Sequence, residues 1–137
     1  MNKHWPDKLP VVQVRVARPT DQIEELERFY CEGLGLDKIG SFAGHRGYTG
    51  LLVGMPDASY HLEFTQHIEG SPSPVPSKDN LLVFYMPNLQ SIENIAQRLM
   101  EMGYPEAAPE NPYWEEKGVT IEDPDGWRIV LMNTEGI

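Results

Sequence analysis

The stretch YHLEFT, residues 60–65, carries the two side chains of this sequence best suited to chemistry. His61 and Glu63 are two residues apart, so on an extended strand both side chains project from the same face. An imidazole beside a carboxylate can hold a divalent metal ion or move a proton. More often, a histidine in such a position is a hydrogen-bonded residue in the wall of a cavity. The pair alone leaves these roles open.

A second group of candidates lies in ENPYWEEKG, residues 110–118. Tyr113 and Trp114 combine large apolar faces with polar tips, which is a usual composition for a ligand-binding wall. Alternatively, the two rings cap the protein's own core or form a subunit contact. Cys31 has no base near it in the sequence and is interpreted as an inert thiol.

The charge of the chain restricts its partners. The 137 residues carry a net charge of −10. No cluster of Lys and Arg could offset phosphate repulsion, so neither nucleic acid nor an anionic membrane is expected as a partner. An acidic chain leaves room for a neutral or cationic small molecule, although acidity also serves solubility. One cysteine, no signal-peptide core and no membrane-spanning apolar run favour a cytoplasmic protein.

The elements that must position these residues occur twice. In the first half, VVQVRVARP (11–19) alternates as a strand and places Gln13 and Arg15 on one face. A helix is predicted next, opened by Asp21 and Glu24 as a capping box and ended by glycines. Three short strands are expected at 37–42, 48–54 and 59–66.

The same order follows a Pro- and Ser-rich linker at 68–79. A strand (80–86), a helix with an apolar stripe (88–103) and three strands (104–107, 118–122 and 127–133) are predicted. We therefore expect a single domain over residues 1–137, with a first βαβββ module at 11–67 and a second at 80–134. Neither module is long enough to bury its helix and sheet alone, so the two must share a core.

Three pieces of sequence carry a family resemblance: FYCEGLGL at the end of the first helix, YHLEFT, and EDPDGWRIVLM at 122–132. With the repeated module order, they resemble the vicinal oxygen chelate superfamily, which includes glyoxalases, bleomycin-resistance proteins and extradiol dioxygenases. The resemblance spans nearly the whole chain. It implies an α+β fold in which two βαβββ modules form a curved, half-open mixed sheet with the helices outside. It also implies a homodimer.

In metal-dependent members of the superfamily, four His or Glu side chains from the first, fourth, fifth and eighth strands hold a divalent ion. The resemblance places the fourth-strand ligand on Glu63, and the first-strand ligand on Gln13 or Arg15. A guanidinium repels a metal cation, and Arg15 could instead form an ion pair with Glu63.

The two remaining ligand positions also depart from the family pattern. The fifth-strand position falls on Asn80 or Leu81, and Asn80 is a weak donor at best. The eighth-strand position falls on Val130, which has no atom that can coordinate a metal. The resemblance therefore implies that the standard metal site of the family is lost.

These observations favour a metal-independent protein that needs no cofactor and binds a small organic molecule in a concave cup. The candidate ligand-binding residues are Gln13, Arg15, His61, Glu63, Asn80, Tyr113 and Trp114. The alternative is a divalent-metal-dependent enzyme of glyoxalase, lyase or dioxygenase type, with a non-standard metal site at Glu63 and His61. A third reading is a protein–protein module whose cup is filled by its own side chains.

Overall fold

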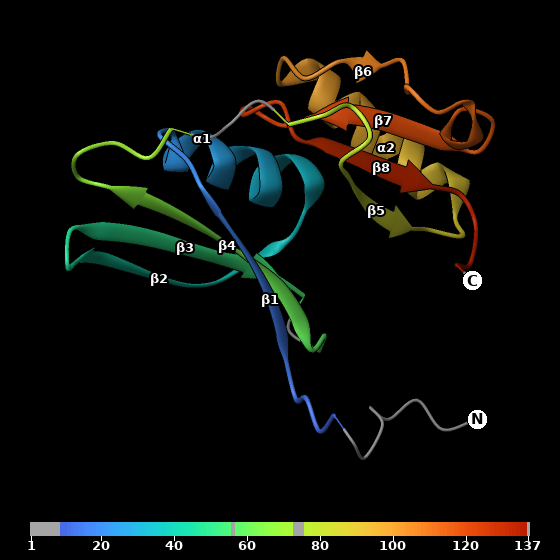
Figure 1. The fold of residues 1–137 in the computed structure, drawn as a ribbon. Coiled ribbons are helices and arrows are strands. Elements are labelled where there is room, and N and C mark those ends of the chain that lie inside the picture. Colours follow the sequence, from blue (N-terminus) through green and yellow to red (C-terminus); the bar gives the residue numbers. More distant parts are fainter. Residues whose placement is uncertain (1–8, 56, 73–75, 137) are drawn as a thin grey trace.

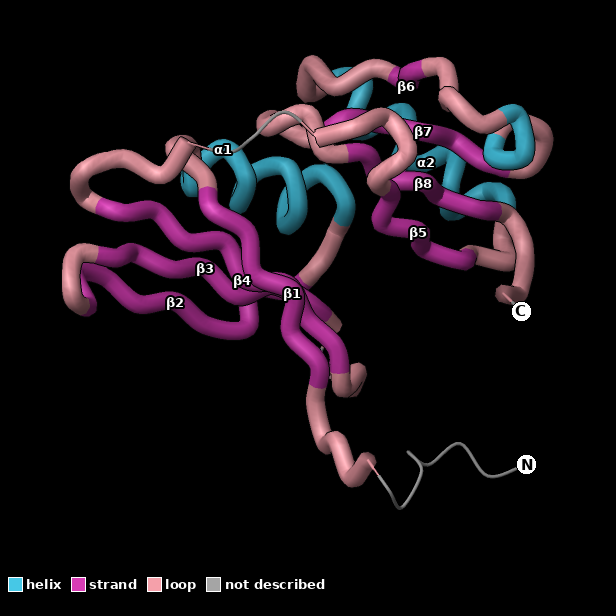
Figure 2. The backbone as a smooth tube through the Cα atoms, viewed as in Figure 1, coloured by secondary structure: helices cyan, strands magenta, loops and turns pink. Residues whose placement is uncertain are grey.

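The computed structural model describes residues 9–55, 57–72 and 76–136, which form two modules with the same order of elements (Figure 1, Figure 2). The first module contains β1 (Val14–Pro19), α1 (Ile23–Glu27), the π-helix η1 (Arg28–Leu34), β2 (Asp37–His45), β3 (Tyr48–Gly54) and β4 (Tyr60–His67). The second contains β5 (Leu81–Tyr85), α2 (Leu89–Glu101), β6 (Glu106–Ala107), the 3₁₀ turn η2 (Pro112–Trp114), β7 (Gly118–Glu122) and β8 (Arg128–Met132). No helix of the described residues is long and apolar enough to span a membrane.

Each module forms its own four-stranded mixed sheet. Sheet 1 has the order β1-β4-β3-β2, and sheet 2 has the order β5-β8-β7-β6. In both sheets the first strand of the module pairs in parallel with its last strand, and the other pairs are antiparallel. The predicted α+β fold is confirmed. Within one chain, however, the strands form two separate sheets rather than one continuous curved sheet (Figure 2).

The register of sheet 1 divides its side chains between two faces. Leu51 lies opposite Phe64, and Val53 opposite Leu62, and all four side chains are at most 8% exposed. This face packs against α1 and η1, which lie above the sheet in Figure 1. The alternate residues of the same strands face away from the helix, because successive side chains of a strand point to opposite sides.

One hydrophobic core joins the two modules, as the length of each half predicts. Leu26 and Phe29 from the first module and Ile92 and Leu99 from the second belong to the same buried cluster. The helices meet at Gly33, where an added Cβ would lie 2.4 Å from the Cδ2 of Leu99. A side chain at position 33 would therefore force the Leu99 side chain to move.

The first helix differs from its prediction at its beginning and agrees with it at its end. Asp21 does not cap it, because the Asp21 carboxylate instead accepts a hydrogen bond of 2.5 Å from the backbone N–H of Ser71. The helix begins after Gln22 without a side-chain cap, and it continues from α1 into η1. It ends, as expected, at a glycine: Gly35 has a φ of 98° and donates its N–H to the carbonyl of Tyr30. The prediction of a capping box is wrong, because the Asp21 carboxylate binds the N–H of Ser71 and not an N–H of the helix.

The strand limits agree with the sequence for β3 and β7 and shift elsewhere. β1 begins at Val14 instead of residue 11, because its ladder with β4 starts at the pair Val14–Tyr60. Residues 9–13 continue beyond the sheet (Figure 2). The predicted linker at 68–79 contains residues 73–75, which lie outside the described residues.

Candidate functional site

Three of the predicted residues meet on the helix-free face of sheet 1. Arg15 lies opposite His61 in the β1–β4 ladder, and Glu63 is two residues further along β4. The Nε of Arg15 donates a hydrogen bond of 2.9 Å to the Nε2 of His61. The Nη1 of Arg15 lies 3.5 Å from the Oε1 of Glu63, so the expected ion pair is present. In this bond Nε2 of His61 is the acceptor, so its lone pair faces the guanidinium.

The exposure of these groups is uneven. The Arg15 side chain is 47% exposed, the Glu63 side chain 14% and the His61 residue 5%. The guanidinium thus faces solvent, whereas the carboxylate and the imidazole lie beneath it.

Glycines and apolar side chains lie next to this cluster on the same face. The ring of Phe42 occupies the space where a Cβ on Gly50 would stand, since its Cε1 lies 2.1 Å from that position. Gly54 likewise leaves room for the side chains of His61 and Ile39. By the register of the sheet, Leu52 lies opposite Glu63. We define the open face as the helix-free surface of sheet 1 formed by Arg15, Ile39, Phe42, Leu52, His61 and Glu63.

The corresponding face of sheet 2 is covered. Val130 lies opposite Val83 and Thr120 in the strand register, and Val130 is completely buried. Two contacts show what lies over this face. Arg128 donates a hydrogen bond of 2.9 Å to the carbonyl of Ala108, and the carbonyl of Trp114 lies against Gly118. The segment at 108–117, between β6 and β7, therefore lies against this side of sheet 2 at Arg128 and Gly118.

The other predicted residues lie apart from this cluster. Gln13 precedes β1 and is exposed. Asn80 precedes β5 and accepts a hydrogen bond from the N–H of Ser77. Tyr113 and Trp114 form η2 and stack edge to face, with ring centroids 4.9 Å apart. They belong to the segment that covers sheet 2, and Tyr113 is 67% exposed.

The residues at the standard metal position do not fit a divalent ion. His61 and Glu63 both interact with the guanidinium of Arg15, whose positive charge would repel a cation at that point. Val130, the eighth-strand position, has no donor atom. Among the described residues, no group of three or more His, Cys, Asp or Glu side chains is arranged to hold a metal.

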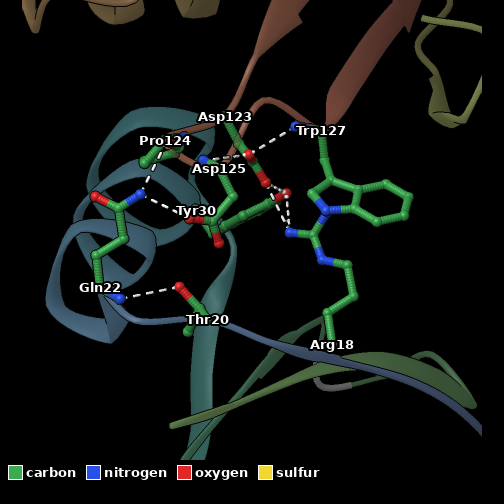
Figure 3. A network of polar contacts seen from close by, with 8 residues as sticks. All are labelled: Arg18, Thr20, Gln22, Tyr30, Asp123, Pro124, Asp125 and Trp127. Carbon is green, nitrogen blue, oxygen red and sulfur yellow. Dashed lines mark hydrogen bonds and ion pairs between the residues drawn. The ribbon is translucent and has the colours of Figure 1, made fainter. Parts of the chain in front are cut away.

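A buried network between the modules was not anticipated from the sequence (Figure 3). Arg18 of β1 forms an ion pair of 2.7 Å with Asp123, in the turn between β7 and β8. The hydroxyl of Tyr30 donates a hydrogen bond of 2.7 Å to the same carboxylate oxygen. The other carboxylate oxygen accepts the backbone N–H groups of Asp125 and Trp127. The Asp123 side chain is therefore fully hydrogen-bonded, as its complete burial requires.

Aromatic rings complete this network. The guanidinium of Arg18 lies 5.0 Å from the ring centre of Phe64 and 4.7 Å from that of Trp127. Burial raises the pKa of the Tyr30 phenol well above its ordinary value of 10, and the charge of Asp123 raises this pKa further. Of these residues, only Asp123 carries a signal in the sequence, because DPDG is a typical turn. Arg18 carries none, because its partner is 105 positions away.

Comparison with known proteins agrees with this architecture. Residues 14–65 match the model of the YycE-like N-terminal domain, and residues 79–133 match that of the YycE-like C-terminal domain. The chain is 58% identical over 125 residues to the uncharacterized protein YycE of Bacillus subtilis (strain 168), covering 91% of this chain and 90% of that protein. The chain belongs to the YycE-like family.

Solved structures of other proteins have the same fold as this chain. A crystal structure of a YycE protein of unknown function from Bacillus subtilis has a TM-score of 0.93 and 55% identity, with 98% of each chain covered. Glyoxalase I of Leishmania major has a TM-score of 0.70 and 15% identity, with 88% of this chain and 85% of that chain covered. TnmS3, an antibiotic binding protein from Streptomyces sp. CB03234, has a TM-score of 0.63 and 24% identity, with 90% and 95% covered. The YycE-like chain therefore has the glyoxalase-like fold that its sequence resembles.

Proposed function

We propose that this protein binds a small organic molecule on the open face of sheet 1 and does so without a metal ion. The observation that carries the proposal is the position of Arg15. Its guanidinium binds His61 at 2.9 Å and lies 3.5 Å from Glu63, so a cationic side chain stands where the resemblance places a metal. The surrounding surface is apolar, which suits an organic ligand.

A binding role has a precedent in this fold. TnmS3, which shares the fold, is described as an antibiotic binding protein. Sequestration of a small toxic molecule requires only a shaped surface and polar groups that orient the ligand. The open face supplies both, with Phe42 and Leu52 as apolar contacts and Arg15 as a polar one.

The proposal includes a homodimer that completes the cup. β1 and β5 are edge strands, because among the described residues each pairs on one side only. Val12 is 87% exposed and Leu9 is 56% exposed on the segment before β1. An apolar groove of about 520 Å³ runs along β5 and includes Leu82 and Phe84. Exposed apolar residues beside unpaired edges favour association with a second copy.

The test is a thermal-shift screen of small organic molecules, including antibiotics, with and without EDTA. A ligand that binds only the folded protein raises its melting temperature by mass action. We expect at least one such ligand, a shift that EDTA leaves unchanged, and loss of the shift in Phe42→Ala. Added Mn²⁺, Co²⁺, Ni²⁺, Zn²⁺ or Fe²⁺ should cause no shift that depends on Glu63. A metal shift abolished by Glu63→Gln would instead support the metal-dependent alternative.

Sedimentation equilibrium tests the dimer separately. We expect a dimer for the wild-type chain and a monomer for Val12→Asp. A carboxylate at position 12 would have to be buried in an apolar contact without an opposite charge, which is unfavourable. A monomeric wild type at all concentrations would contradict this part of the proposal.

A further inference from the structure

We infer that the ligand of the open face is a flat, apolar molecule that carries an acidic group, held by Arg15. This inference rests on the proposed function and specifies the chemical class of the ligand. Three observations support it: the relative exposure of Arg15 and Glu63, the unused donor of Arg15, and the apolar side chains of Phe42 and Leu52 on the same side of the sheet.

The exposure of the charged groups determines which charge a ligand meets. The Arg15 side chain is 47% exposed, whereas the Glu63 side chain is only 14% exposed. A molecule approaching the open face therefore reaches the guanidinium before the carboxylate. The net charge of −10 favours cations at long range. Salt screens that long-range field over about 8 Å at physiological ionic strength, so the exposed group decides the interaction at contact.

The donors of Arg15 are partly free. Its Nε is bonded to His61, and its Nη1 lies toward Glu63. Among the described residues, Nη2 has no hydrogen-bond partner. A guanidinium presents its N–H groups in a planar fork that matches a carboxylate, and such charge-assisted bonds are stronger than neutral ones. His61 and Glu63 hold the guanidinium in place and so reduce the entropy lost when it binds a ligand.

The apolar part of the open face has a defined shape. The Phe42 ring lies across the backbone of Gly50. In the register, Gly50 faces Thr65, and Leu52 faces Glu63, so the ring and Leu52 lie on the same side of the sheet as the charged cluster. Adjacent strands are about 4.8 Å apart, and alternate residues of one strand are about 6.7 Å apart. A planar body of two or three fused rings can cover Leu52 and Phe42 while its acidic group reaches Arg15.

The experiment compares three probes that share one bicyclic body: 2-naphthoate, 2-naphthamide and 2-naphthylmethylammonium. Their dissociation constants are measured by calorimetry on the full-length protein. We expect the acid to bind at least about tenfold more tightly than the amide, the ratio given by one hydrogen bond to a charged group, and the cation to bind most weakly. Arg15→Gln should bring the acid to the affinity of the amide. Phe42→Ala should weaken all three probes alike.

Two further variants sharpen the result. Glu63→Gln removes the carboxylate that competes with an acidic probe, while the hydrogen bond to His61 still positions the guanidinium, so binding of the acid should strengthen. Arg28→Gln, on η1, serves as the control for loss of one positive charge and should leave all three affinities unchanged. Folding of each variant is checked by its unfolding transition in urea.

Three outcomes would overturn the inference, and each can be told apart from failure of the proposed function. Equal binding of acid and amide that is insensitive to Arg15→Gln but weakened by Phe42→Ala would reject the acidic ligand and leave the binding surface in place. Tightest binding of the cation, lost in Glu63→Gln, would reverse the assigned charge. Failure of all three probes to bind would reject the ligand class, and the broader screen would then decide the proposed function independently.

Discussion

At the scale of single residues, two arginines of β1 have opposite roles. Arg15 faces the open side of sheet 1, where it is half exposed and held beside Glu63. Arg18 faces the core side, where its side chain is 15% exposed and pairs with Asp123. Their spacing of three residues places them on opposite faces of the strand. One short strand thus contributes both the proposed ligand-binding group and a tether between the modules, the Arg18–Asp123 ion pair.

The tether predicts a large loss of stability on removal of one partner. Asp123→Ala leaves the buried guanidinium of Arg18 without a counter-charge, and we expect a loss of about 3–5 kcal/mol in the free energy of unfolding. Urea denaturation measures it. The matched control is Glu32→Ala, which breaks the exposed Arg28–Glu32 pair of 3.9 Å and should cost less than about 0.5 kcal/mol. Equal effects of the two substitutions would contradict the assignment.

The raised pKa of Tyr30 predicts that the protein loses stability above pH 10. Burial raises the pKa of its phenol well above 10 in the folded protein, so the folded state keeps a proton that the unfolded state releases. This contribution is complete below pH 10 and decreases as the pH rises above it. Tyr30→Phe should be less stable than wild type at pH 7, because it loses the bond to Asp123. From pH 9.5 to 11 it should show a shallower decline, measured by urea denaturation; parallel curves for the two proteins would exclude Tyr30 as the cause.

At the scale of elements, the two sheets differ in what covers them. On the helix-free face of sheet 1 the Arg15 side chain is 47% exposed, whereas Arg128 and Val130 on the matching face of sheet 2 are buried, and the segment at 108–117 lies against that face at Arg128 and Gly118. The close approach at Gly118 is possible only because glycine has no Cβ: an added Cβ would lie 2.3 Å from the carbonyl oxygen of Trp114.

Gly118→Ala should therefore detach this segment. A methyl group cannot fit against the backbone of Trp114, so the segment must shift, at a cost of about 1–3 kcal/mol for overpacking. We expect faster amide exchange at 109–117, with little change in sheet 1. Gly40→Ala is the control, because its Cβ would meet only Leu52 at 3.5 Å. Unchanged exchange at 109–117 in Gly118→Ala would show that the segment is held elsewhere.

The sequence predicted the elements better than their contacts. The repeated order of strands and helices followed from local periodicity, and β3 and β7 were placed at their observed limits. The ion pair of Arg15 with Glu63 was also predicted, because the resemblance placed both residues on neighbouring strands. The prediction that Asp21 caps the first helix was wrong, since its carboxylate accepts a hydrogen bond from the Ser71 N–H. The Arg18–Asp123 tether and the Phe42–Gly50 contact depend on how strands and modules meet, which local patterns do not encode.

At the scale of the whole molecule, the two modules share one hydrophobic core. The buried cluster contains side chains from both, including Phe29 from the first and Leu99 from the second. The tether adds a polar connection between β1 and the β7–β8 turn. Arg18 of the first module and Asp123 of the second would each lose this partner if the modules were separated.

Division of the chain should therefore abolish folding of each half. We expect fragments 1–72 and 76–137 to be unfolded alone, because each exposes its side of the shared core. Circular dichroism and the dispersion of amide proton signals measure this. Mixing the two fragments should restore a folded complex. A cooperative unfolding transition in either isolated fragment would contradict a shared core.

The unequal covering of the two sheets also has a consequence for mutational tolerance. Val130 is fully buried and Glu63 is not, although the family pattern gives both the same role on matching strands. Selection on the second half should act mainly on abundance, whereas selection on the open face should act mainly on recognition. A library of single substitutions, scored separately for cellular protein level and for ligand capture, should place Val130 among positions that lower both scores. Substitutions of Glu63 should change ligand capture while the cellular protein level stays nearly constant. The first half of the repeat would then be free to diversify, while the second half preserves the stability of the fold.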